Sequence, residues 1–320
     1  MKKLENQEKF DISVVVPIFN EKGNIVKLNS EIQEVISTIT DSYEVIYVND
    51  GSTDGSLKEL KSLAGHITII NLNRNYGQTT AFDAGFKVSN GELVVSLDGD
   101  GQDDPHNIPA LIQKLVDDDL DVVAGWRKVR SDKGGICVLT KIGRWLRKKM
   151  IHDTIHDSGC ALRVYRREAV KSLDIGGEMH RYIMAILRWK GFRIGEVVVN
   201  HRKREHGISK YNYSKAIRGF IDLVYIWFLY KFSQRPLHLF GYAGFFLFFA
   251  GTFSGLVSIY QKIFFDVSVN RSGYFLVGAF MILTSIIVFS FGIVIDLLIR
   301  IQFLASDREK KYYIREIIRK

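Results

Sequence analysis

The first two hundred residues alternate short apolar runs with longer stretches of mixed polarity. The apolar runs are rich in Val and Ile and are bounded by Pro, Gly, Asn or Asp, which is typical of buried β-strands. Strands are predicted over residues 11–17, 43–48, 67–72, 93–95, 120–124 and 192–199, and helices over 21–39, 79–88, 110–116, 168–173 and 180–189. Because strands and helices alternate as in βαβ units, the predicted fold class is α/β with a mostly parallel sheet.

The last third of the chain contains two much longer apolar runs, over residues 237–260 and 274–298. Each exceeds the roughly 20 residues that a helix needs to span a bilayer core of about 30 Å, so both are predicted to be transmembrane helices. Lys and Arg gather before the first run and after the second, whereas the connecting loop holds only Lys262 and Arg271. The positive-inside rule therefore predicts that both termini are cytoplasmic and that the connecting loop lies outside.

These patterns divide the chain into four parts. Residues 214–231 mix apolar, aromatic and charged side chains, which predicts an interfacial helix lying against the lipid headgroups. The predicted parts are a cytoplasmic catalytic domain (1–213), a juxtamembrane amphipathic helix (214–235), a two-helix transmembrane domain (236–304) and a basic cytoplasmic tail (305–320).

The strand over residues 93–95 leads into a dense acidic segment. Asp98 and Asp100 are separated only by Gly99, and Gln102, Asp103 and Asp104 follow. Ligands of open α/β sheets bind beyond the carboxyl ends of the strands. Two carboxylates one residue apart can share a hard cation and leave coordination sites for water and phosphate oxygens. Gly99 is expected to let a ligand approach the backbone. A solvated acidic turn is the alternative interpretation of a single D-x-D pattern.

The composition of the chain and the motifs that it lacks limit the classes of binding partner to be considered. The net charge of +9 indicates an anionic partner, which leaves nucleic acid, a phosphorylated substrate or a membrane surface. Cys137 and Cys160 match no metal-binding spacing and fit reduced thiols in a cytosolic compartment. No apolar signal segment is expected at the N-terminus. Neither G-x-G-x-x-G after a strand nor a P-loop motif occurs, which disfavours the nucleotide-binding folds that depend on them.

Two basic segments flank the predicted site. Residues 125–149 are rich in Arg and Lys and form either a solvated helix face or a surface that meets phosphates or headgroups. Residues 200–213 combine basic side chains with Gly207, which predicts a flexible lid over a pyrophosphate site. His152 and His156 lack the intervening glutamate of a zinc protease, so they are not expected to bind metal.

Several motifs together resemble a known family. S-V-V-V-P-I-F-N-E (13–21), V-N-D-G-S-T-D-G-S (48–56), N-R-N-Y-G-Q (73–78) and L-D-G-D-G-Q-D-D-P (97–105) occur in the order of the family 2 glycosyltransferases, which have a GT-A fold. D-S-G-C-A-L-R-V-Y-R-R (157–167), H-R-K-R-E-H-G-I-S-K-Y (201–211) and the two apolar runs resemble the polyprenyl-phosphate branch of that family. The resemblance covers nearly the whole chain and does not specify the sugar.

The resemblance implies transfer of one hexose, with inversion, from a nucleotide sugar to undecaprenyl (polyprenyl) phosphate. The donor would be a UDP-sugar and the cofactor would be Mg²⁺ or Mn²⁺. The protein would act at the cytoplasmic face of the bacterial inner membrane. A homo-oligomer is one of the assemblies that the resemblance allows. The implied metal ligands and catalytic residues are Asp98 and Asp100, with Asp157 as a base or a residue that positions the acceptor. The implied nucleotide-sugar-binding residues are Pro17, Asn20, Glu21, Asp50, Gln78, Gln102 and Asp103, and the implied phosphate- or acceptor-binding residues are Arg127, Arg163, Arg202, Arg204 and Lys210.

Other functions remain as alternatives. A processive polysaccharide synthase generally needs more spans and a Q-x-x-R-W motif, which this chain lacks. A membrane glycosyltransferase acting on another lipid or glycan acceptor and an inactive nucleotide-sugar-binding scaffold both stay open. A nucleic-acid partner is not expected, because no recognisable binding module accompanies the positive charge.

Overall fold

The structure is a computed structural model, and it describes residues 10–128, 148–151, 155–177, 179–202, 221, 223–228, 231–232, 236–266, 268–269, 272–305 and 314–319. The chain forms two compact units. One comprises Met1–Ile226 with Lys310–Lys320, and the other comprises Trp227–Glu309. Each unit is described separately below.

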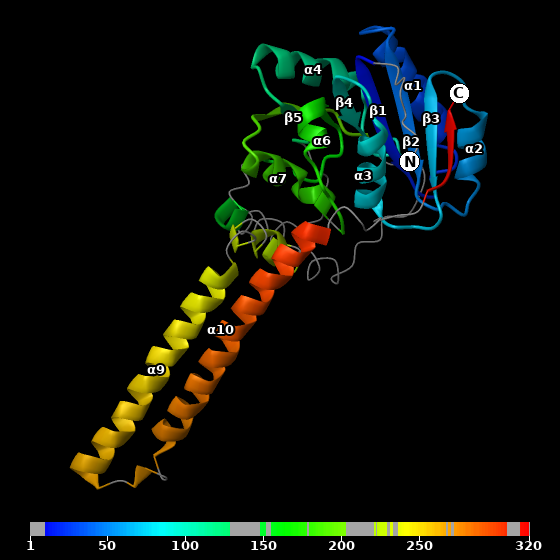
Figure 1. Cartoon of the computed structure of the whole chain (residues 1–320). Coiled ribbons are helices and arrows are strands. Elements are labelled where there is room, and N and C mark those ends of the chain that lie inside the picture. The colour runs from blue at the N-terminus through cyan, green and yellow to red at the C-terminus, as the bar shows by residue number, and fades with distance from the viewer. Residues whose placement is uncertain are drawn as a thin grey trace. The chain divides into compact units, whose positions relative to one another are not determined.

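The first unit is built on one eight-stranded sheet with the strand order β7-β5-β6-β4-β1-β2-β3-β8 (Figure 1). The pairs β1–β2, β1–β4, β2–β3 and β5–β7 are parallel, so the predicted α/β class with a mostly parallel sheet is confirmed. The strands are β1 (Ile12–Ile18), β2 (Tyr43–Asn49), β3 (Ile67–Leu72), β4 (Leu93–Ser96), β5 (Val122–Trp126), β6 (Arg163–Arg166), β7 (Ile194–Val198) and β8 (Ile314–Arg319).

Helices cover both faces of this sheet, because side chains on successive strand positions point to opposite faces. Val14 and Val16 of β1 belong to one buried apolar cluster, and Val15 between them belongs to the other. The first cluster packs against α1 (Ile25–Ser37), α2 (Ser56–Ser62) and α4 (Ile108–Asp117), and the second against α3 (Gln78–Val88), α6 (Arg167–Lys171) and α7 (Ile183–Trp189). Short 3₁₀ turns precede α4 and α7, namely η1 (Pro105–Asn107) and η2 (Met179–Tyr182).

Two strands had no counterpart in the sequence prediction. β6 lies between β4 and β5 and is antiparallel to both. β8 lies in the region predicted only as a basic tail, and it pairs antiparallel with β3 at the outer edge of the sheet. The side chains of Lys61 and Glu316 form an ion pair of 3.0 Å beside this edge. An exposed strand edge offers unpaired amides and carbonyls, so β8 satisfies those of β3.

The second unit is a hairpin of two long helices, α9 (Pro236–Phe265) and α10 (Gly273–Ala305), which run side by side (Figure 1). Both are long and apolar enough to cross a membrane. Gly251 of α9 lies against Gly278 of α10, where an added Cβ would come within 2.8 Å of a backbone oxygen. Of the predicted interfacial helix, residues 221, 223–228 and 231–232 are described and helical, and the remainder lies outside the described residues.

Candidate functional site

Three loops after the parallel strands β1, β2 and β3 are tied together by hydrogen bonds. The Asn20 amide donates to Ser52 Oγ (3.0 Å), and the Thr53 amide donates to Asn20 Oδ1 (2.8 Å). The Asp50 carboxylate accepts from the amides of Tyr76 (2.7 Å) and Gly77 (2.9 Å). Burial raises the pKa of Asp50, and those two amides oppose the rise. Asn20 and Asp50 therefore hold the loops in place.

A cavity of about 300 Å³ opens at these strand ends. Its lining brings together four of the predicted nucleotide-sugar residues, Pro17, Glu21, Asp50 and Gln78, with the acidic pair Asp98 and Asp100. Among the described residues that line it, Asn20 is absent, because its side chain is turned to the Ser52–Thr53 loop. We call this space the donor cavity.

Gly99 lines the donor cavity, and its packing against β1 gives a second reason for glycine at this position. A Cβ at this position would lie 2.5 Å from Ile18 Cδ1 and 2.7 Å from the Pro17 carbonyl oxygen. Glycine is therefore required for the acidic loop to pack against the end of β1, and this packing sets where Asp98 and Asp100 stand.

Carboxylates crowd the loop after β4. Gln78 Nε2 donates a short hydrogen bond to Asp98 Oδ1, and the Gln102 amide donates to Asp100 Oδ1 (3.1 Å). Burial, together with the negative charges of Asp103 and Asp100, raises the pKa of the Asp98 carboxyl well above its usual range. A bound cation would offset this repulsion, because an opposite charge nearby favours the ionised form of a carboxyl group.

The donor set at this loop fits a hard divalent cation. Oxygen ligands are those that Mg²⁺ prefers, and it commonly takes one or two carboxylates and completes its coordination with water and phosphate oxygens. Within the described ranges, no group of three or more His, Cys, Asp or Glu side chains is arranged as a complete metal site. The described residues thus offer only part of a coordination sphere, for which Asp98 and Asp100 are the predicted ligands.

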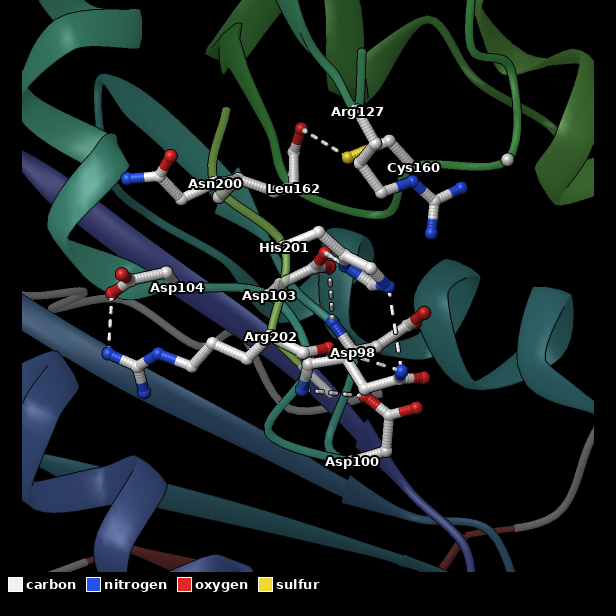
Figure 2. Close-up of polar contacts among 12 residues, drawn as sticks. Asp98, Asp100, Asp103, Asp104, Arg127, Cys160, Leu162, Asn200, His201 and Arg202 are labelled. Carbon is white, nitrogen blue, oxygen red and sulfur yellow. Dashed lines mark hydrogen bonds and ion pairs between the residues drawn. The ribbon is translucent and has the colours of Figure 1, made fainter. Parts of the chain in front are cut away.

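Gln102 and Asp103 belong to the acidic loop but are absent from the residues that line the donor cavity, in the part of the chain that the structure describes. Both contact the segment after β7. The Arg202 amide donates to the Gln102 carbonyl (2.9 Å). Asp103 forms a β-bridge with His201, and Figure 2 shows these two residues together. Asp103 is buried, and that burial raises its pKa to about 6 against the opposing charge of Arg127. Both residues shape the loop from within.

Arg202 joins the acidic loop to α1. Its guanidinium donates to Glu31 Oε2 of α1 (2.7 Å) and to Asp104 Oδ1 (2.8 Å), and the second of these contacts is visible in Figure 2. The position is therefore that of an anchor at the start of the predicted lid. Arg204 and Lys210, which were also predicted to bind phosphate or the acceptor, lie outside the described residues.

A second cavity, of about 370 Å³, shares Asp98 and Gln78 with the donor cavity. It also contains Arg127, Asp157 and Arg163, which the sequence predicted as site residues. Arg127 donates from Nε to Asp157 Oδ2 (2.6 Å) and from Nη2 to Asp157 Oδ1 (3.1 Å). Although burial opposes it, this pairing raises the pKa of Arg127. We call this space the arginine cavity.

Arg163 is almost fully buried in the wall of the arginine cavity. Its guanidinium donates to the backbone carbonyls of Cys160 (2.8 Å), His180 (3.1 Å) and Ser158 (2.9 Å). Because buried carbonyls need a donor, this arginine joins the turn after Asp157 to η2. Its contacts are those of a structural residue of the cavity wall.

The sequence prediction missed one residue that supports the wall of this cavity and two that line it. Glu196 of β7 accepts from the His156 amide (2.9 Å) and from the Asp157 amide, so it orients the turn that carries Asp157. His180 and Arg181 of η2 also line the cavity. A short turn of this kind has no periodicity, and nothing in its local sequence relates it to Thr79, which bonds His180 from a position 101 residues away.

The sequence profile described as glycosyl transferase family 2 matches residues 13–174. The dodecaprenyl-phosphate galacturonate synthase of Rhizobium johnstonii is 34% identical over 97% of this chain and 94% of its own length. The undecaprenyl-phosphate 4-deoxy-4-formamido-L-arabinose transferase of Proteus mirabilis is 32% identical over 84% of this chain and 82% of its own. The chain belongs to glycosyl transferase family 2, in its polyprenyl-phosphate glycosyltransferase branch, as its motifs indicated.

Solved structures agree on the fold. Glucosyl-3-phosphoglycerate synthase from Mycobacterium tuberculosis, in complex with Mn²⁺ and UDP-glucose, matches with a TM-score of 0.54 at 19% identity, over 68% of this chain and 79% of that one. Mannosyl-3-phosphoglycerate synthase from Rubrobacter xylanophilus matches with a TM-score of 0.54 at 16% identity, over 68% and 74%. The first unit thus has a GT-A-like fold.

Proposed function

We propose that this protein transfers one sugar from a nucleotide sugar to a polyprenyl phosphate. The observation behind the proposal is that two cavities meet at Asp98 and Gln78. The donor cavity lies at the ends of parallel strands and holds the acidic pair, as a diphosphate with a divalent cation requires. The arginine cavity presents guanidinium groups, which match the geometry of phosphate oxygens. A sugar at the junction would lie between its leaving group and its acceptor.

The proposed donor is a UDP-sugar, as the motif resemblance implies, and the proposed sugar is a hexuronate. The relative from Rhizobium johnstonii, which aligns with 97% of this chain, is named for galacturonate, a sugar acid. The relative from Proteus mirabilis is named for a formamido sugar and aligns with a smaller share of the chain. Galacturonate is therefore the first sugar to test.

The residues suggest how the transfer proceeds. Asp98 and Asp100 would hold Mg²⁺ or Mn²⁺, which when bound takes up negative charge on the departing diphosphate. An oxygen of the acceptor phosphate bonds to the anomeric carbon while the bond from that carbon to the nucleoside diphosphate breaks, with inversion. The acceptor is already anionic at neutral pH, so a general base is not required. Asp157, whose two oxygens accept from Arg127, positions that guanidinium for the acceptor phosphate.

The proposed location is a membrane face, with both termini on the catalytic side. Support comes from β8, which follows α10 in the chain and pairs with β3 of the catalytic unit. If α9 and α10 both cross the bilayer, the hairpin returns the chain to the side from which it left. The pairing of β8 with β3 supports this same-side arrangement, and the Lys and Arg distribution favours the cytoplasmic side.

A donor screen tests the proposed function. Detergent-solubilised full-length protein is given undecaprenyl phosphate, Mg²⁺ or Mn²⁺, and one radiolabelled nucleotide sugar at a time, and label in the organic phase is counted. We expect one donor, UDP-galacturonate first, to give lipid label that a chelator abolishes. Asp98→Asn should abolish the transfer, whereas Asp121→Asn, at an exposed ion pair with Arg193, should leave it unchanged.

Other outcomes would separate the alternatives. Release of nucleotide with a glycan or a different lipid as acceptor, and none with polyprenyl phosphate, would favour another membrane glycosyltransferase. Binding of the nucleotide sugar without turnover of any acceptor would favour an inactive scaffold. Full transfer by Asp98→Asn would contradict the assignment of the metal ligands.

A further inference from the structure

The arginine cavity contains more ionisable groups than transfer to a phosphate explains. Seven of its described lining residues are acidic or basic: Asp98, Asp157, Arg127, Arg163, His156, His180 and Arg181. Most of them have partners inside the protein. These partners show which groups still have donors available for a ligand.

Four of the basic residues have partners inside the protein. Arg127 is paired with Asp157, and Arg163 donates to three backbone carbonyls. His156 contacts Glu196 Oε2 at 2.7 Å. His180 bonds Thr79 Oγ1 through its ring (2.8 Å), and burial lowers the pKa of His180 to about 3, so the ring is neutral at physiological pH.

Arg181 differs from these groups. It lines the cavity, it is exposed, and it has no hydrogen bond or ion pair with another residue in the ranges that the structure describes. The turn that carries it is nevertheless held firmly. The His180 carbonyl accepts from Arg163, the His180 amide donates to Thr79 Oγ1 (3.3 Å), and the next residue, Tyr182, is buried. Among the described residues, Arg181 is thus a cation without a partner, on a turn whose backbone is held in place by hydrogen bonds.

We propose that Arg181 binds the carboxylate of the transferred sugar and so selects a hexuronate over a neutral hexose. This inference rests on the proposed function and adds a specificity-determining residue to it. A sugar at the junction of the two cavities would lie in the space that Arg181 lines, and a carboxylate removed from water there needs a compensating positive charge. A neutral sugar needs no compensation there. A uronate does, and an unpaired guanidinium supplies it with a two-point geometry that suits a carboxylate.

The acceptor phosphate is the other anion that Arg181 could meet. Arg127 serves that anion better, because Asp157 fixes its orientation through two bonds while its Nη1 atom keeps no partner among the described residues. The two assignments of Arg181, to the sugar carboxylate or to the acceptor phosphate, predict different kinetic effects when the residue is replaced. Loss of a sugar contact changes discrimination between donors, whereas loss of an acceptor contact raises the KM for polyprenyl phosphate and leaves donor discrimination as it was.

The experiment compares UDP-galacturonate with UDP-galactose on full-length wild type, Arg181→Gln and Arg181→Lys. Arg188→Gln is the matched control, because Arg188 lies one to two turns further along, in α7, and outside the cavity lining. Binding of each donor to the metal-loaded protein is measured by calorimetry, and transfer is measured with undecaprenyl phosphate. We expect Arg181→Gln to weaken UDP-galacturonate binding and kcat/KM by about tenfold or more, the loss typical of one hydrogen bond between charged groups.

In the same variant, the binding constant and kcat/KM for UDP-galactose and the KM for undecaprenyl phosphate should stay within about twofold of wild type. A twofold change corresponds to less than about 0.5 kcal/mol. Arg181→Lys should retain part of the preference, because its point charge still attracts a carboxylate. Equal losses for both donors, or a raised acceptor KM alone, would overturn the assignment. Wild type that transfers galactose and rejects galacturonate would overturn it while leaving the proposed transfer intact. Wild type without any lipid transfer would overturn the proposed function, and the two binding constants would still decide the role of Arg181.

Discussion

Arg127 and Asp157 form a two-point ion pair, with Nε 2.6 Å from Oδ2 and Nη2 3.1 Å from Oδ1. The sequence suggested Asp157 as a base or a residue that positions the acceptor. Both of its carboxylate oxygens accept hydrogen bonds, and Oδ1 also accepts from the Gly159 amide (3.1 Å). A carboxylate engaged in this way is suited to orienting a guanidinium rather than to taking a proton.

The first prediction concerns this pair. Asp157→Asn keeps the shape of the side chain but removes its charge and one of the two acceptors, so Arg127 loses its fixed orientation. We expect kcat/KM for polyprenyl phosphate to fall by about 10- to 100-fold, which corresponds to about 1.4 to 2.7 kcal/mol. The affinity for the nucleotide sugar should stay the same. Steady-state kinetics with each substrate varied in turn measures both quantities.

A positioning role and a basic role for Asp157 differ in pH dependence. If Asp157 only orients Arg127, the asparagine variant should keep the shape of the wild-type pH–rate profile at a lower rate. Loss of the acidic limb in that variant would instead identify Asp157 as a base. Asp121→Asn, which disturbs the exposed ion pair with Arg193, serves as the control.

The second prediction concerns Arg202, which contacts both Glu31 and Asp104. Arg202→Gln breaks both ion pairs and so loosens the loop that carries Asp98 and Asp100. We expect the metal concentration for half-maximal activity to rise several-fold, and kcat to fall less. Because the Arg202 side chain is 33% exposed, the loss of stability should be modest, on the order of 1 kcal/mol.

Lys61→Gln is the matched control for Arg202, since Lys61 forms an exposed ion pair with Glu316 far from the acidic loop in sequence. Its metal dependence should equal that of wild type. An unchanged metal dependence in Arg202→Gln would return this arginine to the lid role that its sequence suggested.

Some residues of the site could be predicted from local sequence patterns, and others could not. The acidic pair was predictable because a β-branched run followed directly by Asp98 and Asp100 is a feature of one short segment. The role of Arg202 was not, since its partner Glu31 lies 171 residues earlier in the chain. The same holds for η2, whose position depends on Thr79 and Arg163. β6 was missed because its four residues, Arg163–Arg166, look polar, and they form a strand only between β4 and β5.

The third prediction concerns His180, whose pKa burial lowers to about 3. In the unfolded chain a histidine has a pKa near 6.5, so the unfolded state binds a proton that the folded state excludes. Stability from this group is therefore complete above about pH 6.5 and is lost as the pH falls toward 3. Between pH 6.5 and 5 the loss is at most about 2 kcal/mol, and partial exposure of the ring reduces it.

His180→Asn removes the titrating ring and keeps a side chain that can bond Thr79. Thermal unfolding of the full-length protein at pH 7.5 and pH 5 should show a smaller decrease for this variant than for wild type. His66→Asn, at an exposed histidine, should decrease as wild type does. An equal decrease in all three proteins would show that His180 titrates normally.

The fourth prediction concerns the contact between α9 and α10. A Cβ at Gly251 would lie 2.8 Å from the Gly278 carbonyl oxygen and 2.9 Å from Ile282 Cγ1, whereas one at Gly255 meets no atom within 4 Å. Small residues let membrane helices approach closely, and forcing extra atoms into a packed contact typically costs about 1–3 kcal/mol. Gly251→Leu should therefore lower the unfolding temperature in detergent, and Gly255→Leu, one turn along the same helix, should not. Since both substitutions add the same side chain to α9, equal effects would mean that helix propensity or detergent contact, and not the approach of the two helices, determines the stability of this hairpin.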